Sequence, residues 1–218
     1  TVRSITAYVD TKDGFRFDLD GGRQSNSGAY YFMTLDRTSS AKSKQFTQEF
    51  LVVGSAFNDA LEYAAGLFYF HEQSSQTLTD NVTFSFPTAI LPTTLNTTAN
   101  SYAAFAQLSY KPIEQLTITG GLRYTKDKKE LNASIQSALN FNPVPPYPAQ
   151  TLTSVNRDPS FSSWTPKFGV DFQVTPNLLT YVSVSRGFKA GGFNGLANGQ
   201  AQGLEVVYEP LSVWAYEA

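Results

Sequence analysis

Ten consecutive residues, 116–125 (LTITGGLRYT), alternate between two kinds of side chain, and a period of two is the period of a β-strand. One face would carry Leu116, Ile118, Gly120, Leu122 and Tyr124, and the other Thr117, Thr119, Gly121, Arg123 and Thr125. Residues 164–174 divide as completely, with Trp164 and Phe168 opposite Lys167 and Asp171. Two such segments without a break in the pattern predict a protein made mainly of strands.

Other segments follow the same period less strictly. Residues 102–111 alternate except at Phe105, while 45–55 and 61–72 mix the two kinds of side chain. No helical period of comparable length competes with them. The strands expected from this pattern span residues 2–10, 45–55, 61–72, 102–111, 115–130, 163–174 and 178–188, with a last one starting near 212.

The connections between these segments alternate in length. Tight turns containing Asn, Asp or Pro are expected at 57–61 (FNDAL), 111–115 (KPIEQ) and 175–177 (TPN). Long segments rich in Asn, Ser, Thr, Gly and Pro lie between them, at 11–44, 73–101, 131–162 and 189–211. Short turns on one side and long loops on the other are typical of an up-and-down antiparallel outer-membrane barrel. A Greek-key sandwich would not sort its loops in this way.

Alternation alone also fits a soluble sheet with one face on a core and the other in water. Three features favour lipid: aromatic residues at the ends of the apolar faces, faces of about ten residues, and charges at mid-strand on the opposite face. The aromatic residues are Trp164, Tyr102, Tyr110 and Tyr124, and the charged ones are Arg123, Lys167 and Asp171. The charge run KDKKE (126–130) would then mark where a strand leaves the membrane, although it also fits a solvated hairpin tip.

Composition excludes several classes of protein. Aromatic residues make up 14% of the chain, which suits strands and membrane interfaces, and the formal charge of −2 offers no field for nucleic acid. The absence of cysteine excludes a disulfide scaffold and a thiolate metal site. The longest apolar run, AAGLFYF (64–70), is far shorter than the roughly 18 to 20 residues of a spanning helix. The first residues, TVRSITAYV, lack the pattern of a signal peptide.

Five stretches together resemble the β-barrel part of TonB-dependent receptors of Gram-negative outer membranes. They are QFTQEFLVVGS (45–55), LEYAAGLFYFHE (61–72), YAAFAQLSYKPIEQLTITGGLRYTKDKKE (102–130), WTPKFGVDFQVTPNLLTYVSVSRGFKAGGFN (164–194) and YEPLSVWAYEA (208–218). The resemblance covers most of the chain apart from the long segments. Its most specific part is the stretch SRGFKAGGFN (185–194) followed by a segment in which a proline, Pro210, precedes Tyr216 and Glu217.

This resemblance implies a 22-stranded barrel closed by an N-terminal plug domain. It also implies TonB-energised uptake of a scarce ligand such as a ferric siderophore, cobalamin or a saccharide, with outer-membrane lipid and TonB as partners. The chain departs from the family in extent, because about eight strands are expected, without plug, TonB box or final aromatic-ended strand. We therefore interpret residues 1–218 as an internal part of such a barrel, with a ferric siderophore as the expected ligand.

No catalytic or cofactor motif is found. His71 is the single histidine and no G-x-S-x-G elbow accompanies it, so we expect a rim residue at the end of a strand and no enzyme. Asp10, Asp13, Asp18 and Asp20 do not have the spacing of a calcium loop, and the glycines of KAGGFNGLANG lack a nucleotide-binding pattern. No metal, cofactor or nucleic-acid partner is predicted.

Candidate contacts can be named by position only. Residues expected in external loops that could contact a ligand are Tyr30, Tyr31, Phe32, Tyr147, Phe188, Lys189, Phe193 and Asn194. Residues expected to face the lumen are Glu49, Arg123, Lys167 and Asp171, of which the last three are interpreted first as structural and second as plug contacts. Two other functions remain open at this point: a passive porin-like channel, and a secreted soluble carbohydrate-binding protein. The latter would require the apolar faces to pack against each other.

Overall fold

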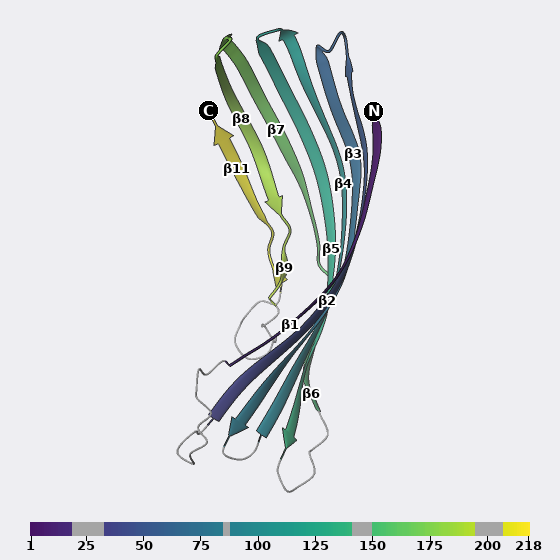
Figure 1. The fold of residues 1–218 in the computed structure, drawn as a ribbon, viewed down its shortest axis with the longest axis vertical. Helices are drawn as coiled ribbons and strands as arrows, with labels where there is room; N and C mark the ends of the chain where they lie inside the picture. Colours follow the sequence, from purple (N-terminus) through teal and green to yellow (C-terminus); the bar gives the residue numbers. More distant parts are fainter. Residues whose placement is uncertain (19–32, 85–87, 141–149, 195–206) are drawn as a thin grey trace.

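The computed structural model describes residues 1–18, 33–84, 88–140, 150–194 and 207–218, and most of them lie in long antiparallel strands of one twisted sheet (Figure 1). The strand order is β1-β2-β3-β4-β5-β7-β8-β11, and β6 pairs with β5 beyond the end of β7. The strands of this sheet are β1 (Val2–Asp18), β2 (Met33–Ala56), β3 (Leu61–Phe84), β4 (Thr88–Ile113), β5 (Leu116–Asn140), β6 (Gln150–Arg157), β7 (Ser160–Thr175), β8 (Leu178–Lys189) and β11 (Leu211–Glu217). The expected all-β, up-and-down antiparallel architecture is therefore confirmed.

A separate two-stranded sheet is formed by β9 (Gly192–Phe193) and β10 (Val207–Tyr208). In the main sheet, β1 and β11 lie at the two sides, so the strands described here form an open curved wall. The wall is seen from the side in Figure 1, with β9 near the ends of β8 and β11.

The strands are much longer than the sequence pattern predicted. Most of the four segments expected as long loops, 11–44, 73–101, 131–162 and 189–211, belongs to strands wherever the structure describes it. The prediction was wrong there because it relied on apolar alternation, and these residues are mostly polar, with no complete alternation, while their backbone pairing continues. Residues 126–130 likewise lie inside β5, so the hairpin-tip interpretation of the charge run is also wrong.

The tight turns occur where they were expected, and all three lie at the upper end of the sheet in Figure 1. They join β2 to β3, β4 to β5, and β7 to β8. In the first of them Phe57, Asn58 and Asp59 adopt positive φ values of 57°, 55° and 65°. The N–H of Ala60 donates to the carbonyl of Phe57 at 3.2 Å, and the two residues between them, Asn58 and Asp59, have the positive φ values of a type I′ turn. We call this end of the sheet the turn end.

Cross-strand register gives the sheet two faces. Leu122 lies opposite Ala106 on one side and Pro166 on the other, whereas Arg123 lies opposite Phe105 and Thr165. We call the face of Leu122 the outer face and the face of Arg123 the inner face. The short β9–β10 sheet packs on the inner face, through Phe193 against the buried Leu131. The inner face is therefore partly covered by the β9–β10 sheet, which does not contact the outer face.

Large apolar side chains of the outer face are exposed. Leu67, Leu108 and Val182 have 61%, 53% and 54% of their surface accessible. Among the described residues, the buried apolar side chains are Ala103, Leu131 and Val155. A single-layer sheet with so little internal core needs another apolar medium against its outer face. The packing of apolar faces against each other, which a soluble sandwich requires, does not occur among the described residues.

Candidate functional site

An aromatic line crosses the outer face at the point where its apolar part ends. Six neighbouring strands, β1, β2, β3, β4, β5 and β7, each contribute one residue to it. In that order these are Tyr8, Phe46, Tyr69, Tyr102, Tyr124 and Trp164. Ring centroids lie 6.2 Å apart for Phe46 and Tyr69, 5.2 Å for Tyr69 and Tyr102, and 4.8 Å for Tyr124 and Trp164. Tyr and Trp prefer the boundary between apolar and aqueous media, because the ring is apolar and its tip is polar.

The aromatic line is not parallel to the hydrogen-bond rungs. The rung that contains Trp164 passes through Tyr124, Ala104 and Leu67 and reaches β2 at Phe50, four residues from Phe46. The line therefore shifts by four residues across the four strand boundaries between β2 and β7. On the turn-end side of the line the outer face is mostly apolar, with the hydrogen-bonded Ser4, Thr6 and Gln48 as polar residues on β1 and β2. On the other side it carries Lys, Asp, Glu, Asn, Gln, Ser and Thr.

The inner face carries the four residues predicted to face a lumen. Glu49, Arg123, Lys167 and Asp171 all share the face opposite to the apolar one, as shown by their partners in the register. They are spread over β2, β5 and β7 and are not brought together into one cluster. Their role as lumen or plug contacts stays a prediction.

Arg123 has an aromatic setting on this face. Its guanidinium carbon lies 5.6 Å from the ring centroid of Phe68 and 5.7 Å from that of Phe105, and its Nε donates to Thr125 Oγ1 at 3.2 Å. Phe105, the one exception to the alternation of β4, lies over Gly66 of β3, where an added Cβ would come within 2.6 Å of the ring. The ring thus covers a glycine that pairs with it directly across the strands, and the cation stacks on the ring.

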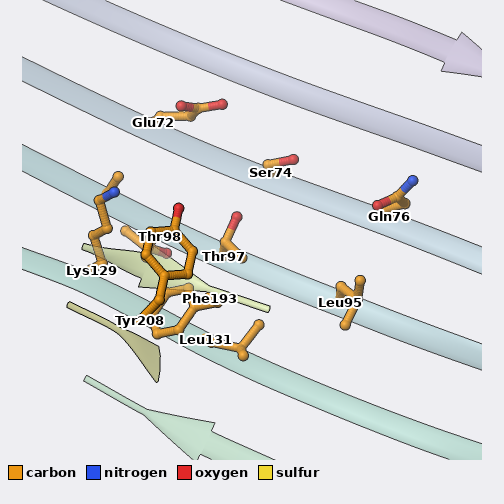
Figure 2. Close-up of a pocket in the computed structure, with 12 residues that line it drawn as sticks. Glu72, Ser74, Gln76, Leu95, Thr97, Thr98, Lys129, Leu131, Phe193 and Tyr208 are labelled. Atoms are coloured by element: carbon orange, nitrogen blue, oxygen red, sulfur yellow. The ribbon is translucent and has the colours of Figure 1, made fainter. Parts of the chain in front are cut away.

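A cavity of about 300 Å³ lies on the inner face beyond the level of the aromatic line, under the β9–β10 sheet (Figure 2). Side chains of β3, β4 and β5 form its floor, and Phe193 and Tyr208 stand over it. The residues lining it are Glu72, Ser74, Gln76, Leu95, Thr97, Thr98, Ala99, Lys129, Leu131, Gly192, Phe193 and Tyr208. It combines aromatic rings, hydroxyl groups, an amide, a carboxylate and one ammonium group.

Three contacts hold the β9–β10 sheet over this cavity. Lys129 Nζ donates to the carbonyl of Gly191 at 2.7 Å. Phe193 packs on Leu131, which is 3% exposed, and this cluster includes Val155 of β6. Gly191 is required by close approach, since a Cβ there would collide with the backbone carbonyl of Tyr208. The roof of the cavity is therefore fixed by one charged hydrogen bond and one small apolar cluster.

Two side chains in the floor of the cavity, Glu72 and Gln76, form hydrogen bonds with side chains of β2. Ser43 Oγ donates to Glu72 Oε1 at 2.8 Å, and Gln76 Nε2 donates to the buried Ser39 at 3.1 Å. Further along the same face, Arg37 makes a bidentate ion pair with Asp80 at 2.6 and 2.7 Å. The hydrogen bonds that Arg37 donates to Asp80 raise the pKa of its guanidinium above the ordinary value. These contacts make the polar part of the sheet a rigid support for the cavity.

Of the eight residues predicted to contact a ligand, Phe193 lines the cavity. Phe188 lies on the outer face of β8, Lys189 lies on its inner face at the end of the strand, and Asn194 follows β9. Tyr30, Tyr31, Phe32 and Tyr147 lie outside the described residues.

Sequence reasoning missed most of the cavity. Lys129, Leu131, Glu72 and Tyr208 were not predicted to line a site. The alternation that was counted to Thr125 continues through Lys129 and Leu131 on the inner face, and following it further would have placed both there. No signal in the sequence shows that Tyr208 folds back over them.

His71 also lies elsewhere than expected. It is in the middle of β3 and not at a strand end, because the pairing of β3 with β4 continues past it as far as Thr83. Its Nδ1 lies 2.8 Å from Oδ1 of Asn100, beside the aromatic line on the outer face. Within the described ranges no group of three or more His, Asp or Glu side chains is arranged to hold a metal ion. No helix in the described part of the chain is long and apolar enough to cross a membrane.

An up-and-down antiparallel wall with an exposed apolar outer face, an aromatic line and a polar inner face defines a membrane-barrel class of architecture. The whole chain, residues 1–218, matches the family model described as TonB dependent receptor-like, beta-barrel. The protein therefore belongs to the TonB-dependent receptor β-barrel family, as the resemblance indicated.

One solved structure supports the fold. The chain is similar to the ferric yersiniabactin uptake receptor FyuA from Yersinia pestis, with a TM-score of 0.66 and 16% identity, over 99% of this chain and 29% of that one. It also matches the ferric-catecholate import receptor Fiu from Escherichia coli K12 at a TM-score of 0.41 and 11% identity, over 92% of this chain and 35% of that one. The chain thus spans less than a third of the length of FyuA, and at this identity the likeness establishes the fold alone.

Proposed function

We propose that these residues form part of the barrel wall of an outer-membrane receptor of a Gram-negative bacterium that takes up a ferric siderophore with energy from TonB. The observation that carries the proposal is the division of the wall by the aromatic line. An exposed apolar band lies on its turn-end side, and a cavity with a roof lies beyond it on the inner face. The family is one of receptors and transporters, and the protein is proposed to have no enzymatic activity.

The remaining parts of the receptor are also part of this proposal. A plug domain and further strands belong to the complete protein, so that the open wall closes and its side strands are paired, as a bilayer requires. TonB would act through that plug. Glu49, Arg123, Lys167 and Asp171 would then line the lumen, with the plug as their neighbour.

The chemistry of the cavity indicates the class of ligand. Tyr208 and Phe193 offer aromatic surface, and Ser74 and Thr97 offer hydroxyl groups. Lys129 is the cation of the cavity, and two of its three ammonium hydrogens remain available after the bond to Gly191. A ferric complex with aromatic groups and anionic oxygen atoms would satisfy all three kinds of contact.

The first experiment tests membrane insertion and uptake together. The complete receptor is expressed in an iron-starved strain without other siderophore receptors, and uptake of radioactive iron is measured from ferric hydroxamate, catecholate and phenolate complexes, with and without TonB. We expect detergent-dependent extraction, heat-modifiable gel migration and uptake of at least one complex that requires TonB. A protein soluble without detergent would contradict the proposal, and uptake that persists without TonB would identify a passive channel.

A variant connects the uptake to the cavity. Lys129→Gln removes the cation, and we expect the affinity for the transported complex to fall by about tenfold, in the range of one charge-assisted hydrogen bond. Lys167→Gln, which removes a lysine from the same face nearer the turn end, is the matched control and should leave the affinity unchanged. If both variants and the parent bind the complex with equal affinity, the complex does not bind in this cavity.

A further inference from the structure

The floor of the roofed cavity carries charges of both signs, and the proposed function uses only the positive one. Lys129 of β5, Ala99 of β4 and Glu72 of β3 lie in one rung of the sheet, on its inner face. Two strand spacings, about 10 Å, separate the two charged residues along the rung. In Figure 2 they lie on either side of the strand that carries Thr97. Within the rung, only the methyl group of Ala99 stands between them.

The two charged groups keep their capacity to bind a ligand. Neither takes part in the ion pairs found between described residues. Each has an uncharged partner instead, since Lys129 donates to the carbonyl of Gly191 and Glu72 accepts from Ser43. An ammonium group can donate three hydrogen bonds and a carboxylate can accept about four. Both side chains are half-buried, so a charged contact here is stronger than one in bulk water.

The cavity has no excess of positive charge. Among the described residues that line it, Lys129 and Glu72 are the charged ones, and their charges cancel. Asp127 lies two residues from Lys129 on the same face of β5 and is half-buried, so it adds a second carboxylate nearby. A complex with several negative charges would be attracted by one ammonium group and repelled by two carboxylates. A complex that carries an ammonium group of its own would be attracted at both ends of the rung.

We propose that Glu72 selects the ligand by its charge. The cavity takes a ferric complex that carries an ammonium group, which binds Glu72, while an oxygen atom of the iron-binding groups binds Lys129. This inference rests on the proposed function, because it concerns the same cavity, and it narrows the class of ligand given there. Polyanionic complexes such as a ferric tris-catecholate are disfavoured by the carboxylates. Glu72 is thus a residue that determines specificity.

The test compares three ferric complexes on the complete receptor in detergent, with dissociation constants measured by quenching of intrinsic fluorescence. Ferric desferrioxamine B carries one free ammonium group, its N-acetyl derivative carries none, and a ferric tris-catecholate carries three negative charges. For the parent we expect the affinity to fall in that order, by about tenfold at each step, the range of one charge-assisted contact. Because the first two complexes differ only at the amine, their ratio reports the contact with Glu72.

Variants connect this order of affinities to the carboxylate. Glu72→Gln should remove the difference between the first two complexes and tighten binding of the tris-catecholate at least about threefold. Its amide can still accept from Ser43, and Glu72→Asp, which keeps the charge, should keep the order. The matched control is Glu130→Gln, which removes an exposed carboxylate next to Lys129 but on the outer face, and should leave all three constants unchanged. Heat-modifiable migration of each variant controls for folding.

Several results would overturn the proposal. These are tighter binding of the tris-catecholate than of ferric desferrioxamine B by the parent, equal affinity for the first two complexes, unchanged ratios in Glu72→Gln, or the same change in Glu130→Gln. Binding of none of the three by a receptor that imports iron from another complex would overturn it too. In a receptor with TonB-dependent iron uptake, any of these results rejects the charge selection alone. If the receptor imports no ferric complex, the proposed function fails with it.

Discussion

The two parts of strand β3 on either side of the aromatic line follow different rules. From Leu61 to Tyr69 the outer side chains are apolar or aromatic, and Tyr63 and Leu67 are exposed, at 38% and 61%. From Gln73 onward the outer side chains are polar and the inner ones mostly polar, and hydrogen bonds, the Arg37–Asp80 ion pair and a small apolar cluster connect the strands. One continuous ladder of backbone hydrogen bonds therefore passes through two environments, and only the side chains change.

The comparison shows what the backbone and the side chains each contribute. In the apolar part the solvent is proposed to be lipid, which stabilises apolar side chains without any partner. In the polar part water competes for every hydrogen bond, so stability requires specific pairs. The same kind of substitution should therefore change the free energy of unfolding by different amounts in the two parts.

The largest difference is expected for a charge on the outer face of β4. Ala106→Arg places it midway between Tyr102 and Tyr110 and should cost about 2–4 kcal/mol in the free energy of unfolding, the range for a cation near the bilayer midplane. Asn96→Arg, on the same strand and face beyond the aromatic line, should change it by less than about 0.5 kcal/mol. Reversible denaturant unfolding of the complete receptor from phospholipid vesicles measures both. Equal costs would show that the two parts share one environment.

A buried leucine in the polar part comes next. Leu131→Ala opens a space under Phe193 and should cost about 2 kcal/mol, the lower end for a buried leucine because the surrounding cluster is small. The loss should appear as faster amide hydrogen exchange in β9 and β10. Leu179→Ala, at an exposed leucine near the turn end, is the control and should leave this exchange unchanged. Slow exchange in both variants would show that other contacts hold the roof.

Ion pairs provide a smaller contrast. Arg37 and Asp80 are only 25% and 22% exposed and form a bidentate pair, so a double-mutant cycle with Arg37→Gln and Asp80→Asn should give a coupling of about 1 kcal/mol. Lys111 and Glu62, at the turn end, are 41% and 52% exposed, and their coupling should be below about 0.5 kcal/mol and vanish in high salt. A larger coupling energy for Lys111 and Glu62 than for Arg37 and Asp80 would contradict the expectation that specific pairs stabilise mainly the polar part.

The smallest effect is expected on the inner face of the apolar part. Arg123→Gln loses the stacking on Phe68 and Phe105 and should cost about 0.5–1 kcal/mol, with iron uptake unchanged. Both quantities are measured on the same preparation of the complete receptor. Lost uptake at unchanged stability would instead assign Arg123 to contact with the plug.

The comparison also explains how much of the molecule could be predicted from its sequence. The apolar part was predicted well, because an apolar outer face and a polar inner face impose a period of two, as from Leu116 to Thr125. The polar part was taken for loops, because both of its faces meet water or polar neighbours and no pattern results, as along β3 from Gln73 onward. The cavity was out of reach for a further reason: Tyr208 and Leu131 are far apart in the sequence, and no rule of sequence pattern brings them together.

The shift of the aromatic line across the rungs has a geometric consequence. A shift of one residue per strand boundary combines a rise of about 3.4 Å along a strand with a spacing of about 4.8 Å between strands, so the strands lean by about 35° from the normal to the line. A layer about 25 Å thick crossed at that slope takes about nine residues of strand. Tyr102 and Tyr110 enclose a stretch of that length on β4. The shift of the aromatic line and the length of the apolar stretch on β4 are thus both consistent with one strand tilt. In a closed barrel every other strand would need the same tilt.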